Sequence, residues 1–426
     1  MSKKICRIDN GVLLISHQLC HLHSVTVSVG FRIGSLYENN YNRGITHFLE
    51  HLLFRHLHDL TQSELYLKMQ MLGAEIVGKT YSDLMSFEIT VVPEFFADAL
   101  NIMLKYFMEV QWTATEFNDE LSVVMRQIEN HSQSYREWLD DSYFSNNAYS
   151  QSIMGDSEAL NNLSIQDLYR WKRQYLVPAN SCVIITGCID EIAIEYAKAQ
   201  LMSLTPSGKS NQPALCLPDN FGRRTLENDC DIIPCDESIS DVTIFFDVPA
   251  ELDYETVKLL SSILAEGCGS KLGIELREKA AFTDDIYAEL VSFYGFSRLS
   301  ISFDVNGADF EKCINTTFQA ISSLCKEIKE EEMISSIIFF TKNQLMDLDD
   351  SISLNRNYMI SDFSLDRNII SNPIDRKAKY ESLDRIKLLE CANKLLISSN
   401  LSFLIETNLD SGLVKKIIER SILKYL

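Results

Sequence analysis

The order of predicted strands and helices in the first half of this 426-residue chain recurs in its second half. The alternating strand at 24–31 has a counterpart at 241–248, and the strand and helix of 85–110 have counterparts at 298–326. The offset is 213 residues from Met85 to Arg298 and 220 residues from Asn180 to Asn400. A chain of this length also exceeds what one core usually holds. The pattern predicts an α+β fold made by tandem duplication, each domain a mostly antiparallel sheet covered by helices.

A stretch rich in Pro, Ser and Gly separates the two halves, because 205–219 holds three of the eight prolines. We therefore expect an N-terminal α+β domain at 1–205, a linker at 206–222, and a homologous C-terminal domain at 223–426. All eight histidines precede residue 132. Any histidine chemistry consequently belongs to the first domain, and the second domain is expected to have no metal site.

The pattern His-x-x-Glu-His lies in the apolar run 44–55. This run contains no proline, and its one glycine is its first residue. The spacing of four places His47 and His51 on one face of a helix, where two imidazoles can bind one Zn²⁺. Glu50 lies at the edge of that face and can take a proton from a zinc-activated water. This order is the inverted form of a zinc peptidase motif. The alternative is that the histidines are packed, hydrogen-bonded core residues and that the pattern is a coincidence.

Charge and cysteine usage narrow the class of protein further. The net charge of −21 argues against nucleic acid or an anionic membrane as the main partner. Eleven scattered cysteines without a Cys-x-x-Cys pair are typical of reduced thiols in a cytosol. The apolar run at 12–15 is too short for a signal sequence, and no stretch approaches the ~18 apolar residues of a membrane span. The predicted location is cytoplasmic.

At the motif, the sequence resembles the pitrilysin family of zinc peptidases, which includes insulin-degrading enzyme and mitochondrial processing peptidase. Residues 34–54 are similar to the family signature almost position by position, and 73–75, 183–190 and 276–279 match further landmarks. The resemblance implies two homologous domains per chain that close with a second chain as a clamshell around a peptide. It also implies Zn²⁺ on His47 and His51, with Glu50 as the general base.

Three positions depart from what the resemblance implies. The family's third zinc ligand is a glutamate seven residues after another glutamate; Glu120 aligns with the outer one, but Gln127 occupies the ligand position. We assign Glu120 to the catalytic group with Glu50, and Gln127 to the metal as a neutral ligand. The family also binds substrate with an Arg and a Tyr seven residues apart. Here Arg277 fits, residue 284 is Asp, and Tyr287 is the substitute.

The third departure is in the edge strand that pairs with substrate, where Val77-Gly78 replaces the family's Asn-Ala. The resemblance thus implies a zinc endopeptidase subunit for short or unfolded peptides, such as leader or precursor peptides. We expect a heterodimer in which a homologous second peptidase subunit supplies a complete Arg/Tyr pair. Two alternatives stay open: a catalytically weak or inactive peptide-binding subunit, favoured by Gln127, and a scaffold of a larger assembly.

Overall fold

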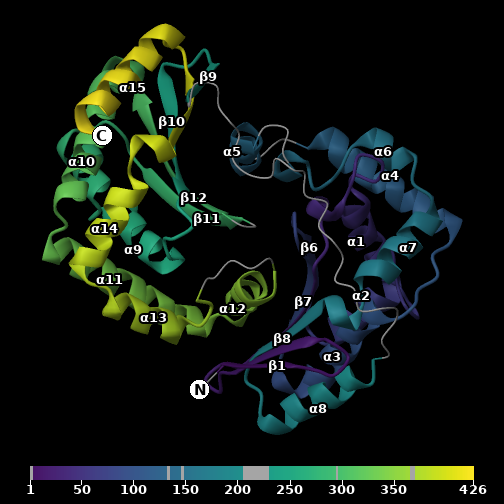
Figure 1. The fold of residues 1–426 in the computed structure, drawn as a ribbon. Coiled ribbons are helices and arrows are strands. Elements are labelled where there is room, and N and C mark those ends of the chain that lie inside the picture. Colours follow the sequence, from purple (N-terminus) through teal and green to yellow (C-terminus); the bar gives the residue numbers. More distant parts are fainter. Residues whose placement is uncertain (1–2, 132–134, 145–147, 205–229, 294–295, 365–369) are drawn as a thin grey trace. The chain divides into compact units, whose positions relative to one another are not determined.

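A computed structural model describes residues 3–131, 135–144, 148–204, 230–293, 296–364 and 370–426 (Figure 1). The fold is α+β, as predicted, with a sheet in each of two compact units. The first unit comprises Met1–Phe221 with Met346–Leu365, and the second comprises Gly222–Leu345 with Asp366–Leu426. The expected linker at 206–222 lies outside the described residues.

The first unit is built on a six-stranded sheet of order β1-β2-β8-β3-β7-β6. Only the β2/β8 pair is parallel, and the other four pairs are antiparallel. The strands are β1 (Lys3–Arg7), β2 (Leu13–Gln18), β3 (Val25–Phe31), β6 (Ile76–Thr80), β7 (Met85–Val91) and β8 (Ser181–Gly187), with a separate small hairpin of β4 (His56–Leu57) and β5 (Leu60–Thr61).

Within the described residues, eight α-helices of the first unit precede the second unit in the chain, and several of them begin at a capping residue. Thr61 and Glu64 form a capping box, the Thr-x-x-Glu pattern typical of a helix N-terminus, and Asp190 caps the helix that follows it by accepting from the N–H of Ala193 at 2.8 Å. Pro93 opens a short 3-10 helix, where its missing N–H and fixed φ suit the first turn. The helices are α1 (Ile45–Arg55), α2 (Gln62–Met71), α3 (Phe96–Leu104), α4 (Ala114–Asn130), α5 (Tyr135–Phe144), α6 (Ser157–Asn161), α7 (Ile165–Tyr175) and α8 (Glu191–Met202).

The two faces of the first sheet differ in chemistry because side chains alternate along each strand. On β3, the face carrying Val27, Val29 and Phe31 packs against α3 and the aromatic side chain of Phe107. The opposite face carries Thr26, Ser28 and Gly30, which are buried but small or polar. A second layer must therefore cover this face and satisfy its hydroxyl groups.

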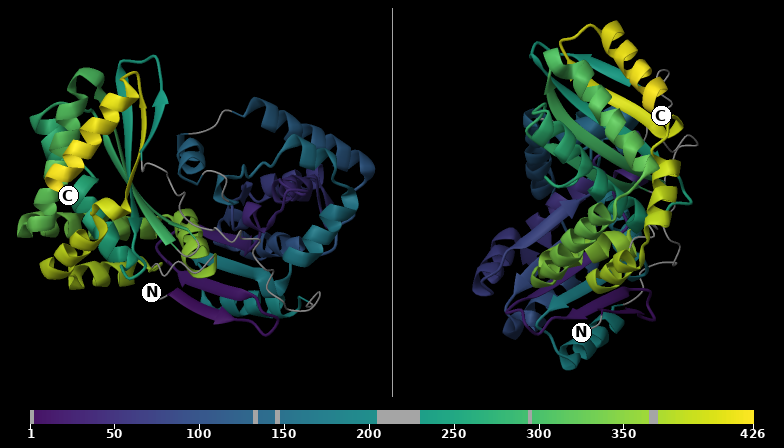
Figure 2. Two further views of the ribbon diagram at one scale, coloured as in Figure 1. Left: turned by 45° about the horizontal axis from the view of Figure 1, so that its top comes forward. Right: turned by 90° about the vertical axis from the view of Figure 1, so that its left-hand side faces the viewer.

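That layer comes from the second half of the chain. Helix α12 (Ser351–Tyr358) and the helical turn η9 (Met359–Phe363), here called the strap, pack on β3 and β8 (Figure 2). Fully buried Asn355 donates to the Thr26 carbonyl at 3.1 Å and to Ser28 Oγ at 2.9 Å. A Cβ on Gly30 would lie 2.2 Å from the Met359 sulfur, so the glycine leaves room for the strap.

Charged and titratable groups add further contacts between the strap and the sheet. Lys3 on β1 pairs with Asp362 at 2.9 Å, and Arg356 pairs with Glu88 on β7. Nδ1 of buried His17 lies 2.7 Å from the Tyr358 hydroxyl. We expected 223–426 to form one domain, but 346–365 belongs to the first unit. The contacts responsible are long-range, and no local sequence pattern predicts them.

The second unit repeats the strand order of the first. Its sheet runs β11-β12-β10-β13-β9, which matches β6-β7-β3-β8-β2, and the parallel pair β13/β9 corresponds to β8/β2. The topology accords with the predicted duplication. The strands are β9 (Cys230–Pro234), β10 (Ile239–Val248), β11 (Ile286–Phe293), β12 (Phe296–Asn306) and β13 (Leu401–Thr407).

Helices cover one side of this second sheet (Figure 1), and their apolar residues join those of the strands in one core. α9 occupies the place in chain order that α1 holds in the first unit, and it contains no histidine. The helices are α9 (Tyr254–Ala265), α10 (Phe310–Lys326), α11 (Glu330–Met346), α13 (Pro373–Ser382), α14 (Arg385–Leu395) and α15 (Ser411–Tyr425). Among the described residues, none of the helices in either unit has the length and apolarity to cross a membrane.

We predict that His17 makes folding sensitive to acid. Burial, and then the nearby charge of Lys3, lower the pKa of His17 from 6.5 to about 4 in the folded chain. The unfolded chain therefore binds a proton more readily between these two values, so stability is present above pH ~6.5 and is lost as the pH falls toward ~4, by up to about 3 kcal/mol. Urea unfolding at pH 7 and pH 4.5 should show a smaller acid loss in His17→Gln than in wild type.

The exposed His23 provides the matched control, because His23→Gln removes an imidazole that the fold leaves in solvent. An equal acid loss in wild type and His17→Gln would contradict the prediction.

Candidate active site

Helix α1 begins at a turn that requires glycine. Gly44 has a φ of 87°, and a Cβ there would lie 2.4 Å from the Met154 carbonyl oxygen. The buried carboxylate of Glu38 accepts from the N–H groups of Gly44 at 2.7 Å and Thr46 at 2.9 Å. A carboxylate here satisfies free donors of the first turn and interacts favourably with the helix dipole. The start of the helix is therefore fixed by both sterics and hydrogen bonds.

One stripe of α1 is half-buried, whereas the other residues of the helix are buried, except for Arg55 at its C-terminal end. His47, Glu50, His51 and Phe54 follow the spacing i, i+3, i+4, i+7, which aligns them along the helix. Apart from Arg55, the remaining residues of the helix pack into the protein, so the stripe is the part of α1 that carries these histidine and glutamate side chains and is not fully covered. The buried residues are Ile45, Thr46, Phe48, Leu49, Leu52 and Leu53.

The two imidazoles of this stripe lie next to each other. The ring centroids of His47 and His51 are 4.7 Å apart, and the ring planes meet at 74°. Burial, and then the nearby His51, lower the pKa of His47 to about 4. His47 is therefore neutral at pH 7, and a neutral imidazole keeps a lone pair for a metal.

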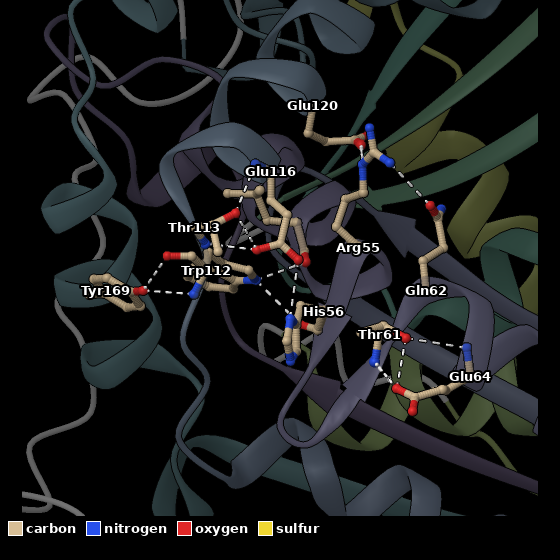
Figure 3. Close-up of polar contacts among 11 residues, drawn as sticks. Arg55, His56, Thr61, Gln62, Glu64, Trp112, Thr113, Glu116, Glu120 and Tyr169 are labelled. Atoms are coloured by element: carbon tan, nitrogen blue, oxygen red, sulfur yellow. Dashed lines mark hydrogen bonds and ion pairs between the residues drawn. The ribbon is translucent and has the colours of Figure 1, made fainter.

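Glu120 on α4 contacts both His51 and the guanidinium of Arg55. Its Oε1 lies 2.8 Å from His51 Nδ1. Its Oε2 accepts from Arg55 Nε at 2.6 Å (Figure 3). Burial alone would raise the pKa of Glu120, but the hydrogen bonds and charges of His51 and Arg55 lower it below its usual value. Because Nδ1 of His51 is engaged, its Nε2 is the nitrogen left for a metal. Carboxylates commonly orient metal-binding histidines in this way.

Further contacts attach the end of α1 to the start of α4. Trp112 Nε1 donates to the carbonyl oxygen of Leu52 at 2.9 Å, and to that of His56 at 3.2 Å (Figure 3). Both bonds satisfy acceptors at the helix C-terminus. His56 Nδ1 lies 3.1 Å from Glu116, whose other oxygen caps α4 at Thr113. These contacts fix the relative position of α1 and α4, and with it the position of Glu120.

Glu50 points to the opposite side, toward strand β6. Its Oε2 accepts a hydrogen bond from the Thr80 hydroxyl, and its Oε1 lies close to the backbone of Gly78. Burial raises the pKa of Glu50, although the Thr80 hydrogen bond and the nearby His51 act in the lowering direction. A carboxylate with a raised pKa beside two imidazoles is suited to accept and return a proton.

The residues present fit a zinc ion, judged by their donor set. His47 Nδ1 is buried and, within the described part of the chain, has no hydrogen-bond partner. His51 has one nitrogen engaged and one left over. Among the described residues, however, no group of three or more His, Cys, Asp and Glu side chains suits a metal. A third protein ligand would therefore be of another type, such as an amide oxygen.

Gln127 occupies the position where the family resemblance implies the third zinc ligand. It lies on α4, seven residues after Glu120, so both side chains project from the same face of the helix. Glu120 is buried and bound to His51, whereas Gln127 is exposed. The fold thus brings together His47, Glu50, His51 and Glu120. The assignment of Gln127 to the metal stays a prediction.

The predicted substrate residues lie in the second unit. Arg277, in the helical turn η6 (Gly273–Lys279), is exposed and donates to Cys268 Sγ at 3.2 Å. Tyr287 is on edge strand β11 with 67% of its surface exposed, and its hydroxyl lies 3.4 Å from Asp285. Both side chains are available to a ligand, and their role stays a prediction.

Sequence reasoning missed three residues that hold the site: Glu38, Trp112 and Thr80. None of them lies at helical spacing from the motif, so periodicity gave no signal. Thr80 lies two residues after Val77-Gly78, which the resemblance had placed in the substrate-pairing edge strand, but no sequence signal extended that strand to Thr80.

Comparison with known proteins agrees with this architecture. Residues 14–157 match the family described as Insulinase (Peptidase family M16), and residues 162–337 match the Peptidase M16 inactive domain. An uncharacterized zinc protease of Rickettsia felis is 22% identical over 350 residues, which cover 80% of this chain and 83% of that protein. The beta subunit of mitochondrial-processing peptidase from Blastocladiella emersonii is 24% identical over 191 residues, covering 44% of this chain and 41% of the subunit.

The fold has solved counterparts as well. The crystal structure of a protease from Helicobacter pylori has a TM-score of 0.77 and 19% identity, and the match covers 95% of this chain and 99% of that chain. The resemblance drawn from the motif is therefore confirmed, and the two matched segments together span most of the sequence: the chain belongs to peptidase family M16.

Proposed function

We propose that this chain is the zinc-binding subunit of an endopeptidase that cleaves short or unfolded peptides. The observation that carries the proposal is the partly exposed stripe of α1, where His47, Glu50 and His51 lie together beneath edge strand β6. The names of relatives as zinc proteases support the same activity.

In this proposal His47 and His51 hold Zn²⁺, with the Gln127 amide oxygen as third protein ligand. The ion, when bound, polarises the scissile carbonyl and makes a water acidic enough to attack it near pH 7. Glu50 takes the proton of the attacking water and delivers it to the leaving amine as the C–N bond breaks. Glu120 keeps His51 oriented and is a positioning residue, which refines its assignment to the catalytic group.

The substrate is proposed to bind as an added strand. β6 pairs with β7 on one side and forms the edge of the sheet on the other. An extended peptide can pair with the backbone of such an edge without help from particular side chains. This mode suits an edge with Val77-Gly78, because backbone pairing does not need the amide side chain that the family carries there.

A homologous second subunit is the proposed partner, forming a cytoplasmic heterodimer. Residue 284 is Asp where the resemblance implies Tyr, so Arg277 and the displaced Tyr287 form an incomplete substrate pair. A relative named as a subunit of mitochondrial-processing peptidase is consistent with two-chain assembly. Leader or precursor peptides are candidate substrates because they are short and unfolded.

One observation favours a second candidate function, a peptide-binding subunit with little or no activity. A neutral Gln127 leaves the charge of a zinc ion less compensated than a glutamate would, and Gln127 is exposed. A subunit that has lost zinc would still offer edge strand β6 to a peptide. The metal content of the purified chain discriminates between the two functions.

Replacing the general base should stop turnover without disturbing the metal. We expect Glu50→Gln to lower kcat by about 10²–10⁴-fold, because the amide cannot accept the proton of the attacking water. Zinc per chain, measured by elemental analysis, should stay equal to wild type. Glu129→Gln on exposed α4 is the control and should be neutral. Full turnover in Glu50→Gln would falsify the assigned role.

Restoring a charged ligand should strengthen zinc binding. If Gln127 contacts the ion, Gln127→Glu should raise zinc affinity at least about tenfold, since a carboxylate neutralises the ion better than an amide. Competition with a fluorescent zinc chelator measures the change. Ser122→Glu is the control, because it adds the same negative charge at another exposed position of α4. It measures how much the added charge alone changes zinc affinity. An equal effect of the two substitutions would remove Gln127 from the ligand set.

Removing the carboxylate that orients His51 should weaken zinc binding as well. We expect Glu120→Gln to reduce zinc affinity about 10- to 100-fold, because the carboxylate no longer orients His51. Glu116→Gln is a matched control on the same helix, since Glu116 holds His56, which is not a proposed ligand. The same chelator competition applies, and similar losses in both variants would indicate a general effect on the packing of α4.

A further inference from the structure

The strand that forms the edge of the first sheet also touches the proposed general base. Side chains alternate along β6, and Gly78 and Thr80 pair with Phe87 and Met85 of β7. Phe87 faces α1 through its contact with Phe54, whose ring centroid is 5.9 Å away. Gly78 and Thr80 therefore face α1, whereas the intervening residue faces the strap side of the sheet.

Both oxygens of the Glu50 carboxylate are located by this strand. Oε2 accepts from the Thr80 hydroxyl. A Cβ on Gly78 would lie 2.7 Å from Oε1 and 2.6 Å from Cε2 of Phe54. The backbone of Gly78 is not in the left-handed region, so glycine is not needed there for its conformation. It is needed because it leaves space for the Glu50 carboxylate. The carboxylate thus lies directly under β6, with one hydroxyl fixing its rotation.

From this geometry we infer that Thr80 is a positioning residue for Glu50. Its hydroxyl holds the carboxylate in one rotation, so that the strand expected to receive the peptide also orients the group expected to take the proton. The inference rests on the proposed function. The inference adds to the proposed function a side chain outside the motif. Thr80 contributes to kcat, because it acts on the base and leaves the backbone edge that receives the substrate unchanged.

The competing explanation is that Thr80 only stabilises the strand. The two roles differ in what a substitution changes. Valine has nearly the shape of threonine and suits a strand, so Thr80→Val removes the hydroxyl and little else. A purely structural role would alter stability or KM and would be insensitive to the identity of residue 50.

The test compares five variants with the wild-type chain, each with its second subunit if one copurifies. The probe is one internally quenched nonapeptide, selected from a random pool because wild type cleaves it. We expect Thr80→Val to lower kcat about 10- to 100-fold, as for a lost hydrogen bond to a charged group, with KM within about twofold. Thr80→Ser should recover most of the activity, because serine restores the hydroxyl.

Two further variants isolate the route through Glu50. Thr90→Val removes a hydroxyl that lies 2.9 Å from Thr26 Oγ1 in the same sheet, and it should leave kcat unchanged. In a Glu50→Gln background, adding Thr80→Val should change the residual rate by less than about twofold, since there is no base left to orient. Zinc per chain should equal wild type in all variants.

Each outcome decides one question. Unchanged kcat in Thr80→Val, an effect on KM alone, or an equal loss in the Glu50→Gln background overturns the inference and leaves the proposed function intact. A zinc-loaded wild type that cleaves no member of the pool overturns the proposed function, and the inference with it.

Discussion

The attachment of α1 to α4 through one buried carboxylate is the interaction on which the site depends. Glu120 binds His51 with one oxygen and Arg55 with the other, so a single side chain fixes both the orientation of a proposed ligand and the distance between two helices. Charge-assisted hydrogen bonds of this kind are stronger than neutral ones and lose less to solvent when buried. Trp112 adds a second attachment by donating to the last carbonyl groups of α1.

Glu50 depends on a different element, the edge strand β6. The base and the ligands thus project from one helix but are held by separate neighbours, α4 for His51 and β6 for Glu50. This separation has a mechanistic consequence under the proposed function. A change in α4 should act on metal affinity, and a change in β6 should act on the rate of the chemical step.

The duplicated units show how one topology can carry different chemistry. Both sheets have the same strand order and the same parallel pair, so the fold does not require the histidines. The motif lies in the first unit, on the helix after its third strand, and among the described residues the strap packs on the small, polar face of the first sheet. In that interface Asn355 and the His17–Tyr358 pair satisfy groups that hydrophobic packing alone would leave buried and unpaired.

The sequence by itself determined the local elements and their repetition. Helical spacing predicted that His47, Glu50 and His51 share a stripe of α1, because that signal lies within a few residues of the sequence. The family resemblance had already placed Glu120 in the site, but only the tertiary structure decided which atoms it and the other distant groups contact. Thr80 contacts Glu50 across 30 positions, Glu120 contacts His51 across 69, and Tyr358 contacts His17 across 341. Such pairs leave no periodic pattern in a single sequence, since they exist only after strands and helices have packed.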